Sequence, residues 1–404
     1  MKVRTLQNIA LFLFFFSINF EVWDPSGSGY LSISKITGFL YFATLIPQLQ
    51  SFLNISEIKG FMNPLWLFFL LLTVMNIINV NFISSEVFDF SIFQNLILLI
   101  LLYNHNRKEP KILEKAMLAY GVGSIFFALL YYMGIGVESS IDGRIQMFGD
   151  NENVIGVRMC ISIIFLAYFI LQNPLKIGAR RFYILIGFPF MFLLLVATGS
   201  RVAFLSFAAS FITATALLKT KRFYWKILLI LIGVIIGIYL WSYISVSGTL
   251  YDRLLKSFNS EDLSDRDIIW SSILPLIKAN PILGVGTTGY ELYCYTTFGR
   301  FVSPHNVILE ILCYTGFTGL LIYLSFLFKI IRKSYLAYKA NGTIVGLLLL
   351  IPILGTILSA QILLLKVGWV LYAYIISKKD NQLADSKITP VRNNLVPFKI
   401  VYQE

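Results

Sequence analysis

The sequence is poor in charged residues and in the residues that form disulfides or bind metals. Only 13% of its 404 residues are charged and 57% are hydrophobic, whereas an average soluble domain has about 25% charged residues. This composition excludes a soluble globular protein. Three cysteines and two histidines show no spacing typical of a disulfide framework or a zinc site, so we expect no metal and no cofactor.

Long apolar runs dominate the chain instead. A helix needs about 20 residues to cross a hydrocarbon core of about 30 Å, and the runs lack the alternation of membrane barrel strands. We therefore predict an all-α polytopic membrane protein with about twelve transmembrane helices, forming one integral domain over residues 1–404. The predicted spans are residues 5–22, 31–52, 62–80, 88–104, 113–134, 153–172, 182–198, 201–218, 224–245, 305–328, 343–359 and 361–377.

The first run resembles a signal peptide because it follows Lys2 and Arg4. No small-residue cleavage site follows it, and we interpret it as a retained helix.

Basic residues are distributed unequally between the two sides of this bundle. Alternate connections hold 23 of the 33 lysines and arginines, and the opposite connections hold seven. Because cytoplasmic loops are enriched in basic residues, we expect both termini in the cytoplasm, with a basic tail at residues 378–404. The net charge of +12 is then explained by topology, and we expect no nucleic-acid partner.

Two outward connections are longer than the others. One covers residues 134–153, and the large loop between the ninth and tenth spans covers residues 246–304. The large loop contains an amphipathic stretch, residues 265–281, which we expect to lie on the bilayer surface or to cap the bundle.

Cations within predicted spans are candidates for function, since each costs about 2.5–3.5 kcal/mol to insert at a helix centre. Lys35, Arg158 and Lys366 are predicted near the outer face, and Arg201 begins the eighth span on that side. The two lysines fit headgroup snorkelling as well as they fit a function. The two arginines are better candidates, because a guanidinium binds phosphate oxygens through two parallel hydrogen bonds.

The two histidines have different predicted surroundings. Ser303 and Pro304 are expected to begin the tenth helix, which places His305 in its first turn at the outer boundary. A helix N-terminus favours the neutral imidazole that a general base requires. His105 lies in a basic cytoplasmic segment, and we expect a solvated loop residue there.

Two motifs are misleading. Gly284, Gly286 and Gly289 match a dinucleotide-binding fingerprint, but no βαβ unit surrounds them and we expect a turn. The acidic pair Asp265 and Asp267 resembles a metal-binding motif, but the intervening Arg266 favours an ion-paired helix start.

The segment PHNVILEILCYTGFTGLL resembles the signature of the O-antigen polymerase and O-antigen ligase superfamily. Its histidine, asparagine and two glycines are His305, Asn306, Gly316 and Gly319. Both outward loops and the start of the eighth span are similar to the family as well. The further matching positions are Arg266, Trp270, Pro281, Gly284 and Gly286 in the large loop, Arg144, Asn151 and Asn153 in the shorter loop, and Arg201. The chain departs from the family at Asp150 and Glu152, where a proline often stands near the asparagine.

The resemblance implies a GT-C-like fold in the bacterial inner membrane, with the large loop in the periplasm. It also implies a metal-independent, inverting glycosyltransferase whose partners are an undecaprenyl-pyrophosphate-linked glycan donor and acceptor, membrane lipid and a chain-length regulator. Arginines would stabilise the leaving pyrophosphate and His305 would act as general base. The implied catalytic residues are His305, Arg266 and Arg201; the implied substrate-binding residues are Arg144, Asn151, Asn153, Arg158, Arg253 and Asn306.

Three functions remain open from the sequence. We prefer an O-antigen polymerase, because aromatic-rich, divergent helices and a compact main loop fit a system-specific polymer-forming enzyme. An O-antigen ligase, which transfers the glycan to lipid A-core, uses the same donor chemistry. A polysaccharide-lipid transporter would be indicated by an inverted repeat and discontinuous helices, and the sequence shows neither.

Overall fold

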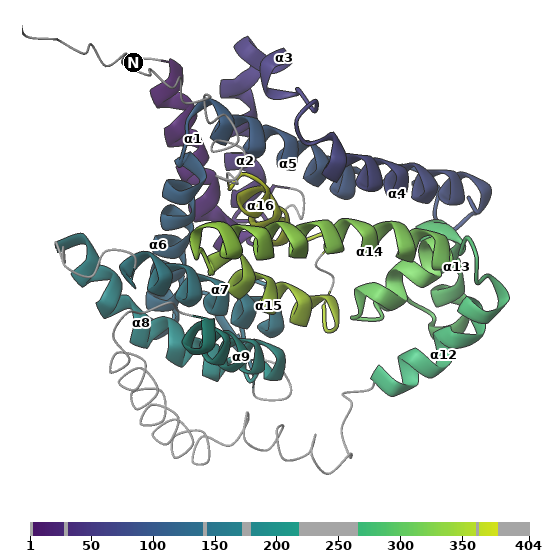
Figure 1. Ribbon diagram of the computed structural model, residues 1–404. Coiled ribbons are helices and arrows are strands. Elements are labelled where there is room, and N and C mark those ends of the chain that lie inside the picture. Colours follow the sequence, from purple (N-terminus) through teal and green to yellow (C-terminus); the bar gives the residue numbers. More distant parts are fainter. Residues whose placement is uncertain are drawn as a thin grey trace, which may run out of the picture.

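The computed structural model describes residues 3–27, 31–139, 144–171, 179–217, 266–360 and 363–378 (Figure 1). These residues are almost entirely helical. The elements are α1 (Val3–Ser17), η1 (Ile18–Phe20), α2 (Ile33–Leu45), η2 (Ile46–Gln48), α3 (Leu49–Phe52), α4 (Lys59–Ile78), α5 (Phe90–Lys108), α6 (Ile112–Tyr132), β1 (Val137–Ser139), β2 (Ile145–Met147), α7 (Glu152–Leu171), α8 (Ala179–Ala197), α9 (Arg201–Leu217), α12 (Arg266–Ala279), α13 (Gly286–Phe298), α14 (Val307–Asn341), α15 (Val345–Ile357) and α16 (Lys366–Ile376).

The described helices confirm a polytopic membrane protein. Every predicted span outside residues 218–265 contains a helix. Five helical segments are long and apolar enough to cross a membrane, namely α1 with η1, α4, α6, α7 and α14, and shorter apolar helices occur in α8, α9, α15 and α16. The predicted ninth span, the first part of the large loop with Arg253, and most of the basic tail lie outside the described residues, so the total of twelve spans stays a prediction.

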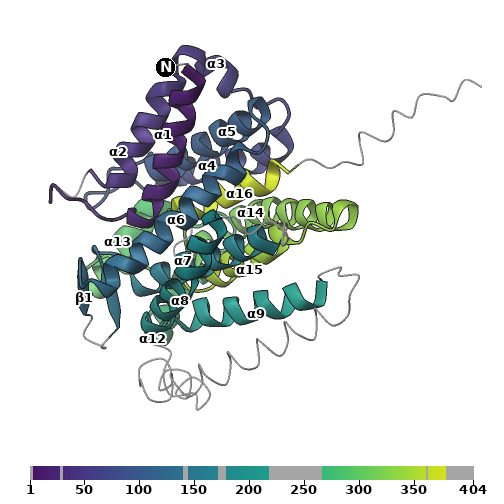
Figure 2. The same ribbon diagram turned by 90° about the vertical axis from the view of Figure 1, so that its left-hand side faces the viewer.

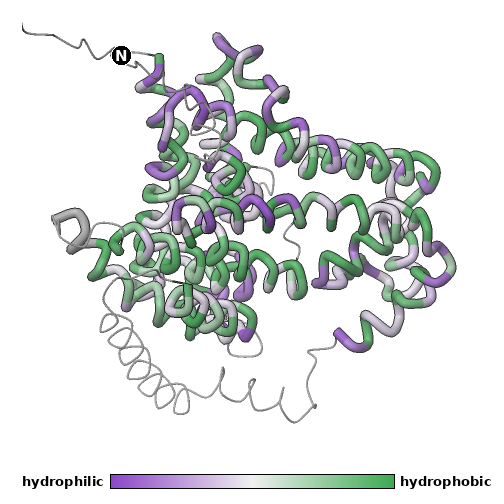
Figure 3. Tube along the Cα trace, viewed as in Figure 1, coloured by the Kyte–Doolittle hydropathy of each residue, from purple (hydrophilic) through white to green (hydrophobic). Residues whose placement is uncertain are grey.

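Helix α7 forms the centre of the bundle. It packs against α6, α8, α9 and α15, and every residue from Val154 to Leu166 is buried. A helix that is apolar on all sides is expected in such a position. Figure 1 and Figure 2 place α1 and α2 on one side of α7 and α9 on the other. Hydrophobic residues predominate along most helices, and many hydrophilic residues lie at helix ends and connections (Figure 3).

The polar ends of the helices form two separate groups. Arg4 pairs with Glu109, and Lys378 pairs with Glu114 five residues further along the chain. These contacts place the start of α1 and the end of α16 at one end of the bundle. A separate group of contacts lies at other helix starts: Arg144 bonds to Thr198 before α9 and to Asn153 in α7, and Trp270 of α12 bonds to Pro304 before α14. This grouping agrees with the two predicted sides; which side faces the cytoplasm stays a prediction.

His105 corrects one sequence prediction. It is 2% exposed and lies in the last turn of α5, because this helix continues through the basic segment to Lys108. Its Nδ1 is 3.0 Å from the Tyr41 hydroxyl oxygen and its Nε2 is 3.0 Å from Asn8 Oδ1. His105 is therefore a buried residue joining α5 to α1 and α2, and the expectation of a solvated loop residue was wrong.

Helix α14 is broken at Gly316, which has φ 60° and ψ −162°. Part of the large loop fills the break, since the Phe317 amide donates to the Pro281 carbonyl at 2.8 Å and the Val285 amide donates to the Cys313 carbonyl at 2.8 Å. These bonds satisfy backbone groups that an interrupted membrane helix would otherwise leave unpaired. The expectation of no discontinuous helix was therefore wrong at this position. The turn expected at Gly284, Gly286 and Gly289 is present only at Gly284, which has φ +66°. The expectation was wrong for Gly286 and Gly289, because α13 begins at Gly286 and includes both.

We expect Gly316→Ala to destabilise the protein strongly. A Cβ atom there would lie 2.4 Å from the carbonyl carbon and oxygen of Ile282, in addition to the cost of about 1–3 kcal/mol for a side chain at this φ and ψ. Gly299→Ala is a matched control, because Gly299 also has positive φ, at +71°, but has no atom within 4 Å of an added Cβ. Thermal unfolding of the purified variants should show a much larger loss for Gly316→Ala. Equal losses would contradict a tight contact at the break.

Candidate functional site

The shorter loop, which was predicted at residues 134–153, is fixed by Arg144, which is 6% exposed. Its Nε donates to the Thr198 carbonyl at 3.1 Å, and one terminal nitrogen donates to Asn153 Oδ1 at 3.0 Å. The other terminal nitrogen lies 3.2 Å from Glu152 Oε1. Arg144 thus connects the β1–β2 hairpin, the start of α7 and the turn before α9. Asn151 lies at the same place, where its Oδ1 accepts from the Asn153 amide at 2.9 Å.

Arg201 is the first residue of α9, as the sequence predicted. The preceding turn contains Gly199 with φ +62°. Gly156 of α7 allows this turn to approach closely, because a Cβ at Gly156 would lie 2.9 Å from Thr198 Oγ1 and 2.9 Å from the Ala203 Cβ. Since Arg144 bonds to the same turn, Arg144 and Arg201 lie on adjoining segments.

Arg266 and Trp270 attach α12 to the segment between α15 and α16 and to the segment before α14. A terminal nitrogen of Arg266 donates to the carbonyl of Ser359, between α15 and α16, at 3.3 Å. One turn later, Trp270 Nε1 donates to the Pro304 carbonyl at 2.9 Å. Trp270 therefore positions the residue immediately before His305. Only part of the amphipathic stretch packs inward, since Ile273 is buried and Ile268 is 58% exposed.

His305 lies just before α14, with its amide donating to Ser303 Oγ at 3.0 Å. The N-cap of α14 is Asn306, whose Oδ1 accepts from the amides of Ile308 and Leu309 at 2.9 and 3.2 Å. The expectation that Ser303 and Pro304 begin the helix was therefore wrong by three residues. The physical reason is that asparagine caps a helix as well as serine does, and His305 itself has φ +50°, outside the helical region.

Electrostatic effects connect His305 to the other candidate residues. Partial desolvation lowers the His305 pKa below its usual 6.5, the positive charge of Arg266 lowers it further, and the negative charge of Glu152 raises it. The hydrogen bond from Trp270 to the Pro304 carbonyl independently places α12 beside the residue that precedes His305. The side chain of His305 is exposed and accessible to a substrate.

Arg158 is surrounded by protein groups. It is 1% exposed, forms ion pairs with Glu21 at 2.9 Å and with Asp150, and donates to the Asn19 carbonyl at 3.3 Å. These contacts join α7 to the end of α1 and to the shorter loop. A substrate-binding role for Arg158 stays a prediction, but its contacts are those of a structural residue. Sequence reasoning missed both acidic partners.

The arrangement combines an accessible imidazole with arginines on neighbouring segments. It can bind phosphate oxygens and accept a proton from a bound hydroxyl group. Within the described ranges, no group of three or more His, Cys, Asp or Glu side chains is placed to hold a metal ion. Neither Arg253 nor Asp265 belongs to those ranges.

Comparison with known protein families shows that residues 186–324 are similar to the O-antigen ligase family. The family resemblance is thus confirmed over this range, which includes Arg201, Arg266, His305 and Asn306. The shorter loop with Arg144, Asn151 and Asn153 precedes the matched range. A search of curated proteins found no match.

Proposed function

We propose that this protein is a membrane glycosyltransferase of the O-antigen polymerase type. It would join undecaprenyl-pyrophosphate-linked repeat units, using one lipid-linked glycan as donor and another as acceptor, with a chain-length regulator as a further partner. The observation that supports this most strongly is the similarity of residues 186–324 to the O-antigen ligase family. Within this range, Trp270 of α12 bonds to Pro304 beside His305.

In the proposed reaction, an acceptor sugar hydroxyl attacks the anomeric carbon of the donor from the face opposite the pyrophosphate. The new bond joins the hydroxyl oxygen to the anomeric carbon, the bond to the pyrophosphate oxygen breaks, and the hydroxyl proton passes to the neutral His305 ring. One displacement inverts the anomeric configuration. Arg201 and Arg266 stabilise the charge that develops on the pyrophosphate, with Arg144 and Arg253 as further candidates, and Asn151, Asn153 and Asn306 contribute to the loops that contact substrate. We propose no metal requirement.

We expect Arg201→Lys and Arg266→Lys each to reduce turnover about tenfold to hundredfold while the protein stays folded. Lysine keeps the charge but cannot form the planar, two-pronged contact with phosphate oxygens. Arg300→Lys is a suitable control, because Arg300 is an exposed arginine of the large loop that also contains Arg266. Turnover would be measured with purified protein and a lipid-pyrophosphate-linked donor. Near-normal turnover in both variants would remove these arginines from the mechanism.

We further propose one integral domain in the bacterial inner membrane, with both termini in the cytoplasm and the loop at residues 246–304 in the periplasm. In a variant lacking Cys160, Cys294 and Cys313, a membrane-impermeant thiol reagent applied to spheroplasts should label Arg300→Cys but not Lys59→Cys. Both positions are exposed, so accessibility within the fold does not distinguish them. Labelling of position 59 alone would reverse the orientation.

The length of the products distinguishes the possible functions. Purified protein incubated with a defined lipid-pyrophosphate repeat unit should form a ladder of lipid-linked oligomers. Addition of one glycan to lipid A-core, without a ladder, would instead identify a ligase. Absence of any transfer by a folded, membrane-reconstituted protein would favour the transporter.

A further inference from the structure

The segment immediately before α14, residues 302–305, is held by side chains of two other helices. The Tyr290 hydroxyl group of α13 donates to the Val302 carbonyl at 2.8 Å. Trp270 Nε1 of α12 donates to the Pro304 carbonyl at 2.9 Å. Two of the four carbonyl groups in this segment are therefore fixed from outside it.

A further contact comes from Glu310, in the first turn of α14. Its carboxylate accepts a hydrogen bond from the Ser303 hydroxyl group at 3.0 Å, and the same hydroxyl oxygen accepts from the His305 amide at 3.0 Å. A serine hydroxyl group has one proton and two acceptor lone pairs. Because its proton is directed to Glu310, its oxygen can accept from His305. Glu310 thus acts on the His305 backbone through Ser303.

The position of Glu310 suits this contact. The residue is 3% exposed, and a buried carboxylate is costly unless hydrogen-bond donors surround it. Its place in the first turn of α14 adds to the stability of a negative charge, because the helix dipole is positive there. Hydrogen bonds to a charged acceptor are stronger than those between neutral groups. The bond from Ser303 is therefore well suited to fix a backbone.

The backbone that these bonds hold has an uncommon conformation. His305 has φ +50°, in a region that residues with a side chain adopt at a cost and retain where surrounding contacts impose it. Its side chain is nevertheless exposed, whereas the preceding Pro304 is buried. The contacts therefore fix the His305 backbone and leave the ring accessible.

We propose that Glu310 is a positioning residue for His305 and acts through Ser303. The two hydrogen bonds keep the His305 backbone in its left-handed conformation, which limits the directions in which the exposed ring can point. The proposal rests on the proposed function, because a general base must lie within hydrogen-bond reach of the hydroxyl group it deprotonates. A displacement of about 1 Å can reduce a rate about hundredfold.

Turnover of purified variants tests this role. Glu310→Leu removes the acceptor and Ser303→Ala removes the hydroxyl group, so each should reduce kcat about tenfold to hundredfold. The KM for the donor should be nearly unchanged, because the arginines proposed to contact it remain. Glu310→Gln should restore most of the rate, since its amide oxygen can still accept from Ser303. Ser271→Ala is the matched control, because Ser271 is an exposed serine of α12 whose hydroxyl group donates within its own helix.

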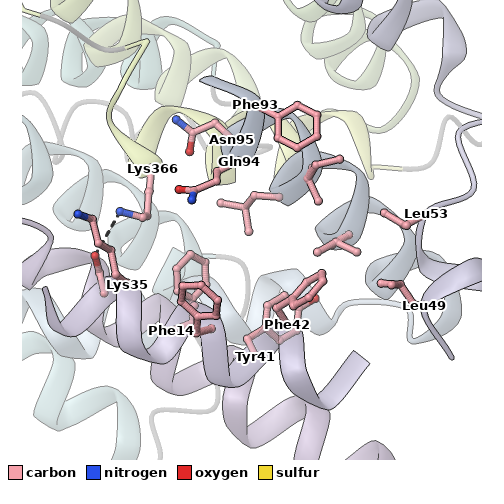
Figure 4. A pocket seen from close by; sticks show the side chains of 16 residues that line it. Phe14, Lys35, Tyr41, Phe42, Leu49, Leu53, Phe93, Gln94, Asn95 and Lys366 are labelled. Carbon is pink, nitrogen blue, oxygen red and sulfur yellow. Dashed lines mark hydrogen bonds between the residues drawn. The ribbon is translucent and has the colours of Figure 1, made fainter. Parts of the chain in front are cut away.

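A substitution in a remote pocket controls for a general loss of stability. This pocket, of about 430 Å³, includes residues of α1, α2, α3, α5 and α16 and none of residues 302–305. Figure 4 shows Phe14 of α1 among its labelled residues. Phe14 is 1% exposed, so Phe14→Leu should lower the unfolding temperature through lost packing. It should leave kcat unchanged.

NMR of the full-length protein tests the positioning without turnover. The chain contains only two histidines, so labelled histidine gives signals from His105 and His305 alone, which the spectrum of His305→Ala assigns. Cα and carbonyl chemical shifts report the backbone conformation. We expect the wild-type His305 shifts in Glu310→Gln and Phe14→Leu, and altered or multiple shifts in Glu310→Leu and Ser303→Ala. The His105 signals should stay the same in these four variants.

The results separate this proposal from the proposed function. Wild-type His305 shifts in both Glu310→Leu and Ser303→Ala would overturn the proposal, as would Glu310→Gln that behaves like Glu310→Leu. Altered shifts combined with full turnover by His305→Ala would support the contact made by Glu310 and reject His305 as the base.

Discussion

His305→Ala should reduce turnover about 10²- to 10⁴-fold, the contribution typical of a positioned general base. Donor binding should be retained, because the arginines that are proposed to contact the pyrophosphate remain. The exposed His305 ring lies outside the α14 cap, which is formed by Asn306, so the substitution should not unfold the helix start. Turnover, donor binding and thermal unfolding would be compared with wild type at equal amounts of folded protein.

The pH dependence provides an independent test of the same residue. Desolvation and the charge of Arg266 lower the His305 pKa below 6.5, so the ring remains neutral at neutral pH and becomes protonated only under more acidic conditions. The wild-type rate should therefore fall as the pH decreases below 6.5, and His305→Ala should lose this acidic limb. If the variant retains both the wild-type rate and the acidic limb, the base is another group, with Glu291 of α13 as the next candidate.

Arg158→Met should destabilise the protein by about 3–5 kcal/mol, the cost typical of removing one partner from a buried ion pair. The substitution leaves Glu21 and Asp150 buried at 9% and 3% exposure. Arg4→Met is the matched control, because the Arg4 side chain is 63% exposed in its pair with Glu109 and such pairs contribute at most about 1 kcal/mol. Unfolding of both variants in the same detergent would measure the difference.

A second substitution distinguishes a structural role of Arg158 from substrate binding. Asp150→Asn in the Arg158→Met background removes one uncompensated charge while Glu21 keeps its pair with Lys366, so part of the lost stability should return. If Arg158→Met is instead as stable as Arg4→Met but inactive, the substrate-binding role predicted from the sequence is the better description.

The sequence was informative where function and structure depend on local pattern. Apolar run length located the described helices other than α12 and α13, because crossing a membrane requires a minimum helical length. The predicted start of the eighth span at Arg201 is the observed start of α9. The motif around His305 identified the family domain, even though the helix start was misplaced by a few residues.

Contacts between residues far apart in the chain could not be predicted from local sequence patterns. Arg158 was recognised as an unusual charge, but its partner Glu21 is 137 residues away along the chain, and hydropathy contains no information about such a pair. The break in α14 similarly depends on backbone contacts between Gly316 and Ile282. His105 was expected in a solvated loop because its segment is rich in polar residues. The helix α5 instead continues to Lys108, and the face that carries His105 is buried.

The anomeric configuration of the newly formed bond tests the central claim most directly. Purified protein would be incubated, in the presence of a metal chelator, with a lipid-pyrophosphate-linked oligosaccharide of defined configuration, and the product would be analysed by NMR. The account predicts a new glycosidic bond of inverted configuration, because one acceptor hydroxyl displaces the pyrophosphate directly with His305 as base. Retained configuration, or no transfer by the folded protein, would contradict it.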